Sequence, residues 1–351
     1  MSSLVVREPG LFTTLQDLGR FGAQALGMPV AGAIDMLALR LANALAGNGP
    51  NMGALEVGFM GPTLEIAADS LRIAVVGSIQ LALLQDGAEK PLATNQSHRL
   101  TRGQVLKLGF VSGAAYAYLA VEGGFAVTPF INSVSTYTRA GLGGFNGRKL
   151  TAGDTLPLAR DAVAARSELA TNSALPYGAS LDGNSPIRIV LGPQDDYFTP
   201  DAIAAFLGND YTVTKEADRM GLRLDGPKLN HSKGADIVSD AIATGCIQVP
   251  GTGAPIVLLA DHQTIGGYPK IATIASVDLP RTGQLTPGSK LRFAAVTVAQ
   301  AEQLRRDQEQ AFARLIASIA PTRPAGGIDL DALSNANLID GMIDAQSAND
   351  H

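Results

Sequence analysis

Residues 258–291 read LLADHQTIGGYPKIATIASVDLPRTGQLTPGSKL, and this stretch holds the densest group of polar residues in the chain. An apolar run over 256–260 predicts a buried strand, which leads directly into a polar segment at 261–264 and a Gly-Gly pair at 266–267. Glycine permits positive φ and a close approach to a ligand. Because binding residues commonly lie on loops held by a rigid scaffold, the stretch predicts a site where the strand ends. The alternative is a polar hairpin loop with a Gly-Gly turn.

The candidate chemistry comes from eight polar side chains, most of them in this stretch: Asp218, Arg219, Asp261, Gln263, Thr264, Tyr268, Lys270 and Arg281. Arginine can hold a carboxylate through two hydrogen bonds, and a carboxylate can act as a base or orient another donor. Glutamine and threonine can bond an amide or a lactam. This set of side chains therefore suits a small, polar, amide-like acid as the substrate.

We expect Asp261 and Lys270 to act in catalysis. The residues expected to bind substrate are Arg219, Gln263, Thr264, Gly266, Gly267, Tyr268 and Arg281. The alternative is that the pairs Asp218–Arg219 and Asp278–Arg281 are only local ion pairs on turns.

Outside this stretch, short apolar runs separated by turn residues predict a mainly β fold. The expected strands are 4–8, 56–57, 61–66, 71–76, 80–84, 105–110 and 115–121, with another strand starting at Ile187. Residues 13–29 read as a glycine-broken loop. Helical spacing predicts one helix from Ile34 to Gly47, where Asp35 is either a cap or a ligand, and another over 301–320. A small amphipathic element is expected at 328–345.

A short pattern, L-T-x-G-x-x-L, occurs at Leu100, Leu150 and Leu285, and it predicts a tight turn that leads into a strand. Its recurrence favours two β-rich domains of related build, although strand-turn-strand segments also resemble each other by chance. The expected division is an N-terminal domain over 1–160, a linker over 161–185, a second domain over 186–298 and a helical tail over 299–351.

Composition excludes several classes of protein. The net charge is −5 and no basic block occurs, so we expect no nucleic-acid partner. Cys246 is the only cysteine, which rules out an internal disulfide and suits a reduced, cytoplasmic location. The N-terminus lacks an apolar core of the signal-peptide type, and no apolar run is long enough to span a membrane.

Several familiar catalytic motifs are also missing from the sequence. The run GLGGFNGRK at 141–149 has neither dinucleotide-binding nor Walker A spacing. It is interpreted as a hairpin of small residues, with an anion held by its backbone N–H groups as the alternative. The four histidines lack metal-ligand spacing, so no metal is expected, and no G-x-S-x-G motif is present. The chain has no Ala-Met-Lys-Met run for attaching biotin.

Three motifs resemble one known family. The run ADHQTIGGYP at 260–269 resembles the hallmark A-D-x-Q-T-T-G-G-Y-P of the allophanate hydrolase subunit 2 family, also called KipA-like or the 5-oxoprolinase C subunit family. The run ADRMGLRLDG at 217–226 resembles that family's S-D-R-M-G-x-R-L-x-G. Near the N-terminus, 10–22 is similar to its G-x-x-T-x-Q-D-x-G-R-x-G. Two positions depart from the family: Ile265 replaces the second threonine, and Val134 stands where relatives often carry arginine.

The resemblance implies two cyclophilin-like β-barrel domains. It implies one component of an ATP-dependent 5-oxoprolinase, which opens 5-oxo-L-proline to L-glutamate together with a KipI-like B subunit and a LamB-like A subunit. The complex would use ATP, and this chain would carry no covalently bound cofactor. Two alternatives remain open. One is the carboxyltransferase half of a biotin-dependent, urea-carboxylase-like system, and the other is a non-catalytic KipA-type regulator that binds a KipI-like partner.

Overall fold

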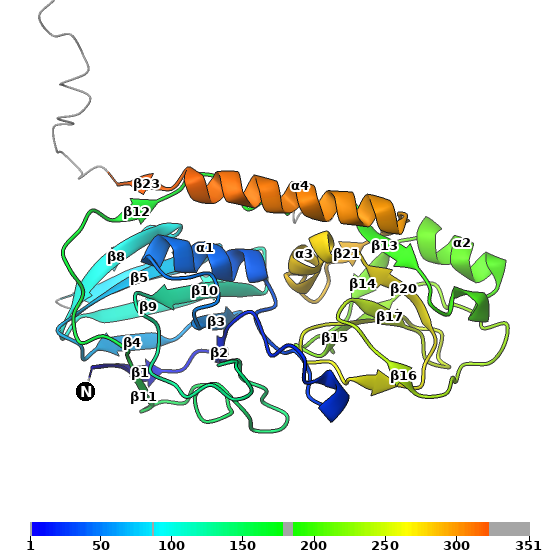
Figure 1. The fold of residues 1–351 in the computed structure, drawn as a ribbon, viewed down its shortest axis with the longest axis horizontal. Coiled ribbons are helices and arrows are strands. Elements are labelled where there is room, and N and C mark those ends of the chain that lie inside the picture. Colours follow the sequence, from blue (N-terminus) through cyan, green and yellow to red (C-terminus); the bar gives the residue numbers. More distant parts are fainter. Residues whose placement is uncertain (1, 86–87, 178–184, 323–351) are drawn as a thin grey trace, which may run out of the picture.

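A computed structural model describes residues 2–85, 88–177 and 185–322. The described chain is mainly β, with four α-helices and three short 3-10 helices (Figure 1). The amphipathic element expected at 328–345 lies outside the described residues. Among the described residues, no helix is both long and apolar enough to cross a membrane.

The first half of the chain forms two antiparallel sheets, and one of them is extended by a short strand from near the end of the described chain. The first sheet has the order β11-β1-β4-β9-β6-β7. Its strands are β1 Ser3–Glu8, β4 Thr63–Ile66, β6 Ile79–Gln85, β7 Ala88–Pro91, β9 Val105–Val111 and β11 Thr155–Pro157. The second sheet has the order β2-β3-β10-β5-β8-β12-β23. Its strands are β2 Phe12–Gln16, β3 Ala54–Gly58, β5 Ser70–Val76, β8 Gln96–Thr101, β10 Tyr116–Val121, β12 Leu169–Ala170 and β23 Ala320–Pro321.

One hydrophobic core joins the two sheets of this half. Leu4 and Leu106 from the first sheet belong to the same buried cluster as Leu15, Ile73 and Leu119 from the second. Side chains alternate between the two faces of a strand, so the neighbours of Ile73 and Leu119 point the other way. Ala74 and Ala120 accordingly belong to a different cluster, which also contains helix α1.

The second half contains one eight-stranded sheet that closes almost completely on itself. The strand order is β21-β14-β15-β18-β17-β20-β13-β22. The strands are β13 Ile187–Leu191, β14 Tyr211–Val213, β15 Gly221–Asp225, β17 Cys246–Gln248, β18 Ile256–Leu258, β20 Lys270–Ile274, β21 Lys290–Leu291 and β22 Phe293–Ala295. Because β21 and β22 are almost consecutive in the chain but pair at opposite ends of the sheet, the segment 290–295 closes the barrel. A separate ribbon pairs β16 Asp240–Ala241 with β19 Ile265–Gly266.

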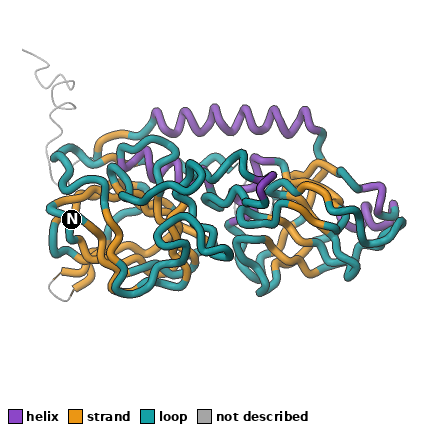
Figure 2. The backbone as a smooth tube through the Cα atoms, turned by 60° about the horizontal axis from the view of Figure 1, so that its bottom comes forward, coloured by secondary structure: helices purple, strands orange, loops and turns teal. Residues whose placement is uncertain are grey.

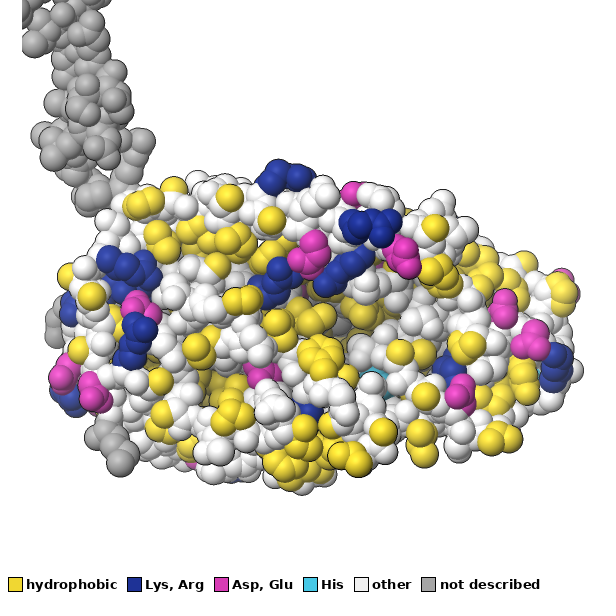
Figure 3. Space-filling view, in the orientation of Figure 1, with side chains coloured by type: hydrophobic (Ala, Val, Ile, Leu, Met, Phe, Trp, Pro, Cys, Tyr) yellow, Lys and Arg dark blue, Asp and Glu magenta, His cyan; other side chains and the backbone are white. Residues whose placement is uncertain are grey.

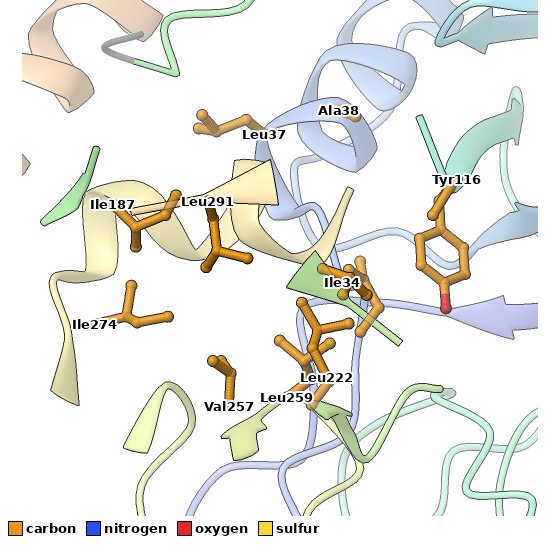
Figure 4. Packing of buried hydrophobic residues seen from close by; sticks show 14 of the residues in the cluster. Ile34, Leu37, Ala38, Tyr116, Ile187, Leu222, Val257, Leu259, Ile274 and Leu291 are labelled. Carbon is orange, nitrogen blue, oxygen red and sulfur yellow. The ribbon is translucent and has the colours of Figure 1, made fainter. Parts of the chain in front are cut away.

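Helix α1, Met36–Ala46, packs on the second sheet of the first half, against β5 and β10 (Figure 1). Asp35 caps it by accepting hydrogen bonds from the backbone N–H groups of Leu37 and Ala38, so the cap interpretation is confirmed. Just before the helix, Ile34 lies between Tyr116 of the first half and Leu222 and Leu259 of the second, as Figure 4 shows. These residues belong to one continuous cluster, so the two halves share a core.

Helix α4, Val298–Ala317, crosses from the second half back over the first (Figures 1 and 2). It begins with a capping box, in which Thr297 and Gln300 satisfy each other's free N–H groups. Arg40 of α1 forms two 3.0 Å hydrogen bonds to Glu309 and lies 4.2 Å from the ring centroid of Phe312. After α4, β23 pairs with β12 at the edge of the first half's second sheet.

The remaining helices are short. They are η1 Gln24–Leu26, η2 Asp195–Tyr197, α2 Pro200–Gly208, η3 Ser276–Asp278 and α3 Leu279–Gly283. Thr199 caps α2 and Pro200 starts it, as is common for a first helical turn.

The structure confirms a mainly β chain with a few helices, including helices close to those expected at 34–47 and 301–320. One expectation was wrong, because Phe12–Gln16 forms strand β2 where a loop was expected from residue 13. Its five residues pair in register with β3, and this long-range pairing has no local sequence signal. The repeated pattern L-T-x-G-x-x-L does form turns that lead into β9, β11 and β21. Its glycines have φ of 83°, 86° and 89°, at Gly103, Gly153 and Gly288.

Candidate functional site

The two most distinctive sequence motifs lie side by side. Strands β15 and β18 are antiparallel neighbours, with Gly221 opposite Leu258. The pairing continues beyond the strands, because the N–H of Asp261 donates to the carbonyl of Arg219 over 2.9 Å. The strand ending predicted from the sequence therefore lies against the segment that contains Arg219.

Arg219 and Asp261 form a buried ion pair. Nε and Nη2 of Arg219 donate to the two carboxylate oxygens of Asp261 over 2.9 and 3.0 Å. The remaining donors of Arg219 reach the first half, where they bond Glu56 and the carbonyl of Gly32. Arg219, Asp261 and Glu56 are all buried, so this cluster joins the two halves through charged hydrogen bonds.

Burial and the neighbouring charges shift the pKa values of this cluster in opposite directions. Burial raises the pKa of Glu56, while the charge of Arg219 and the hydrogen bond from Tyr118 act to lower it. Burial alone would lower the pKa of Arg219, but the charges of Asp261 and Glu56 outweigh it and raise that pKa. Arg219 is therefore a fixed cation, and its hydrogen bonds go to protein atoms.

A cavity of about 570 Å³ opens beside this cluster. Gln263 and Tyr268, both predicted from the sequence, line it together with Asp218. Its other polar lining residues are Arg139, Lys215, Glu216, Arg223 and Gln248. An adjoining cavity of about 630 Å³ shares Lys215 and Tyr268 with it.

The polar groups of this cavity are largely paired with one another. Arg223 lies 3.0 Å from Glu216, and Arg139 lies 3.6 Å from Asp218. Lys215 has no ion pair among the residues that the structure describes.

Two amide side chains meet at the wall of the cavity. Nε2 of Gln263 donates to Oε1 of Gln248 over 3.3 Å, and Nε2 of Gln248 donates to the carbonyl of Tyr268. Amides, the ammonium group of Lys215 and a phenol together suit a ligand that carries both an amide and a carboxylate.

The other predicted residues of the stretch build the ribbon and its attachment. Nζ of buried Lys270 donates to Asp240 of β16 over 2.7 Å, and this bond lowers the pKa of Asp240. Gly266 is opposite Asp240, and a Cβ there would lie 2.7 Å from Nε2 of Gln248. The carbonyls of Thr264 and Gly267 accept backbone hydrogen bonds from Ile242 and Ile237.

Arg281 lies elsewhere, in a second buried ion cluster. It donates to Asp278 and to the carbonyls of Ser185 and Pro186. Burial acts to raise the pKa of Asp278, but hydrogen bonds from Arg188 and Arg281 outweigh it, and that pKa is lowered. The local pair Asp278–Arg281 is thus confirmed. The pair Asp218–Arg219 does not form, because Arg219 bonds Asp261 and Glu56.

Several residues near the site were not among those expected from the sequence. No sequence pattern marked Glu56 as a site residue, because it is a single carboxylate within a strand. Asp17 and Arg20 lie in the N-terminal motif, and Arg20 is fully buried with one nitrogen, Nη1, that has no hydrogen-bond partner among the described residues. His262 is also buried, and burial lowers its pKa.

The run at 141–149 forms a tight loop against the N-terminal motif. Leu142, near its start, pairs with Tyr137, and the N–H of Gly147 donates to the carbonyl of Gly143. A Cβ at Gly144 would lie 1.8 Å from Oγ1 of Thr136, so only glycine fits there. Within the described ranges, no group of His, Cys, Asp and Glu could hold a metal ion.

Comparison with known proteins gives consistent results. The sequence profile of the family described as "Carboxyltransferase domain, subdomain A and B" matches residues 26–295. The chain is 38% identical over 296 residues to the 5-oxoprolinase C subunit of Haemophilus influenzae, covering 84% of this chain and 92% of that one. It is 35% identical over 312 residues to the 5-oxoprolinase C subunit of Escherichia coli, covering 89% and 97%.

A solved structure agrees with these relatives. The K. lactis urea amidolyase is 29% identical to this chain and superposes with a TM-score of 0.79 over 89% of it. The match covers 20% of the urea amidolyase chain, so most of that protein has no counterpart here.

Proposed function

This chain belongs to the family of the carboxyltransferase domain, subdomain A and B, and on that premise we propose that it is the C subunit of an ATP-dependent 5-oxoprolinase. The observation that carries this proposal is the match to two 5-oxoprolinase C subunits over 92% and 97% of their lengths. The complex would open the lactam of 5-oxo-L-proline to give L-glutamate, with a KipI-like B subunit and a LamB-like A subunit as partners.

The cavity beside the ion cluster is the proposed substrate site. 5-oxoproline carries a lactam and a carboxylate, which are the two groups that the lining suits. Gln263 and Gln248 would bond the lactam, and Lys215 would attract the carboxylate. Tyr268 would close one side of the site.

With the substrate in this cavity, the other residues expected at the site take structural roles. Arg219 and Asp261 would position the cavity wall, because Met220 and Gly221 follow Arg219 directly and line the cavity. Lys270 would hold the ribbon through Asp240. Arg281 would stabilise the start of β13 through the carbonyls of Ser185 and Pro186.

A lactam is a poor electrophile, and ATP offers a way to activate it. Transfer of the terminal phosphoryl group of ATP to the lactam oxygen would make the ring carbon electrophilic, so that water could add to it. The C–N bond would then break, which frees the amine and leaves an acyl phosphate. A second water would cleave the acyl phosphate to give L-glutamate and phosphate. The part proposed for this chain is to bind and orient the lactam. Contact between ATP and this chain is not required.

The finer architecture is also a proposal. We divide the chain into a domain over 1–160, a linker over 161–185, a second domain over 186–298 and a tail over 299–351, with both domains cyclophilin-like barrels. The almost closed sheet of the second half supports this division, because all its strands lie between Ile187 and Ala295.

A carboxyltransferase acting with a biotin-carrying partner is the second candidate. The superposition on urea amidolyase favours it, although only one fifth of that chain is matched. Omitting this chain from a mixture of the A and B subunits, with ADP release measured on addition of 5-oxoproline, separates the candidates. The proposal expects turnover only when all three subunits are present. Turnover without this chain would contradict it.

A further inference from the structure

The first half contributes a single residue, Arg139, to the proposed substrate cavity. Of the described residues that line this cavity, all the others come from the second half and lie between Lys215 and Tyr268. In Figure 1, the loops between β10 and β11 extend from the first half toward the second. The second half therefore builds the walls of the cavity, and the first half adds one cation to them.

The turn that carries Arg139 is fixed at its base. Tyr137 and Leu142 pair with each other through two backbone hydrogen bonds of 2.8 and 3.2 Å. Between them, the N–H of Gly141 donates to the carbonyl of Thr138 over 3.3 Å. Gly141 has φ of 66°, which glycine adopts without strain. The backbone of Arg139 is thus held in place at the tip of a closed turn, and only its long side chain is free to reorient.

The guanidinium group of Arg139 is held only loosely. Its Nη2 lies 3.6 Å from Oδ2 of Asp218, and the two side chains are 59% and 58% exposed. That distance is too long for a hydrogen bond, and the guanidinium group bonds no other residue in the described ranges. Oδ1 of Asp218 is already used, because it accepts from the N–H groups of Met220 and Gly221. Exposed pairs of this kind contribute little free energy, so Arg139 can exchange Asp218 for another carboxylate at little cost.

Few charged groups compete for Arg139. On the face shown in Figure 3, charged side chains lie mainly along α4 and toward the two ends of the molecule, and few lie where the halves meet. Among the described residues, Asp218 is the only carboxylate that pairs with Arg139. Arg223, the other arginine of the cavity, is taken by Glu216 at 3.0 Å. Arg139 is therefore the arginine of the cavity that is available to a bound anion.

We propose that Arg139 makes the cavity specific for a lactam that carries a carboxylate. On binding, the guanidinium group leaves Asp218 and donates two hydrogen bonds to the substrate carboxylate, because the planar fork of arginine matches that group. Lys215 adds charge attraction without this directional match. The inference rests on the proposed function and names its specificity-determining residue. A lactam without a negative charge leaves Arg139 with Asp218 and binds more weakly.

The test uses the complete complex with Arg139→Gln, Arg139→Lys or Asp218→Asn in this chain. ADP release gives KM and kcat for 5-oxo-L-proline. Calorimetric titration gives the dissociation constants of 5-oxo-L-proline and of its neutral amide, 5-oxo-L-prolinamide. Arg102→Gln is the matched control, because Arg102 is 60% exposed, pairs with Asp69 and does not line the cavity. Urea denaturation checks that each variant is folded.

We expect Arg139→Gln to raise KM and the dissociation constant for 5-oxoproline about tenfold or more, because two charge-assisted hydrogen bonds are lost. Binding of the neutral amide should stay unchanged, and kcat should change less than about twofold, since Arg139 does not contact the lactam. Arg139→Lys should give an intermediate KM, because lysine keeps the charge but not the fork. Arg102→Gln should behave as the wild type.

Asp218→Asn should change KM in the opposite direction. Asparagine keeps the Oδ1 that accepts from Met220 and Gly221, but the competing negative charge is gone. We expect KM for 5-oxoproline to fall about two- to fivefold, because Arg139 no longer has to leave a carboxylate.

Three results would overturn the role of Arg139. They are unchanged binding of 5-oxoproline in Arg139→Gln, an equal loss of binding for the neutral amide, and a rise in KM in Asp218→Asn. A wild-type complex that binds 5-oxoproline without turnover contradicts the proposed function alone, and the dissociation constants then still decide the role of Arg139. No binding of 5-oxoproline to the wild-type complex contradicts both.

Discussion

Arg219 donates hydrogen bonds to two carboxylates that come from distant parts of the sequence, Glu56 and Asp261. A buried charge without its partner is strongly destabilising, whereas a complete buried pair contributes little net stability. The main effect of the cluster is therefore to fix the position of the two halves relative to each other. It holds the backbone that continues into the cavity wall.

Replacing Asp261 by alanine should leave Arg219 buried with one carboxylate fewer. We expect the free energy of unfolding to fall by about 3–5 kcal/mol, measured by urea denaturation. Asp225→Ala is the control, because Asp225 is exposed on β15 and should change stability by less than about 0.5 kcal/mol. Equal stability of the two variants would show that the buried pair is not formed.

Asp35 gives a prediction about pH. Burial raises its pKa, against hydrogen bonds from Tyr177, Gln284 and the first turn of α1. A carboxyl group with a raised pKa in the folded state contributes stability below its unfolded pKa of about 4, and that contribution is lost as pH rises through the raised value. Asparagine does not titrate, so the stability of the wild type minus that of Asp35→Asn should be larger at pH 5 than at pH 8. Thermal or urea unfolding at both values checks this. A difference that grows with pH would contradict it.

At the residue scale, the sequence predicted which segments meet but not what each side chain does. Arg219 and Asp261 were both expected at the site, and the structure places them together. Their burial against Glu56 could not be foreseen, because 163 residues separate Glu56 from Arg219. Gln263 and Tyr268 line the cavity, whereas Arg281 belongs to a separate cluster.

At the scale of elements, helix α4 fastens the second half to the first. Arg40 of α1 holds Glu309 of α4 with two hydrogen bonds, and β23 continues onto the edge of a sheet. Both helices were predictable from their spacing and caps. The two-residue strands β12, β16, β19 and β23 were not, since each exists only through a partner far away in the chain.

A double-mutant cycle on Arg40 and Glu309 measures how strongly α4 is held. Both side chains are half-buried, so we expect a coupling free energy of about 0.5–1 kcal/mol from chemical denaturation. The exposed pair Arg306–Glu302, 3.8 Å apart within α4, is the control and should couple by less than about 0.3 kcal/mol. Equal coupling in the two pairs would mean that this contact does not fasten the helix.

At the scale of the whole molecule, one hydrophobic cluster includes residues of both halves. Ala74 and Tyr118 of the first half share it with Leu222 and Val257 of the second, and buried residues of α1 belong to it as well. Composition and turn spacing predicted the mainly β character. They could not predict this shared core, because it depends on which faces meet after folding. The candidate cavity also draws on both halves, with Arg139 from the first and Gln263 from the second.

The KM for 5-oxoproline in ADP release by the complete complex measures most directly whether the cavity binds the lactam. Gln263→Ala should raise KM about tenfold or more, because one hydrogen-bonding amide is removed from the proposed lactam site. Lys290→Ala, an exposed change on β21 outside the cavity, should leave KM unchanged. An unchanged KM in Gln263→Ala, or turnover that does not depend on this chain, would contradict the account.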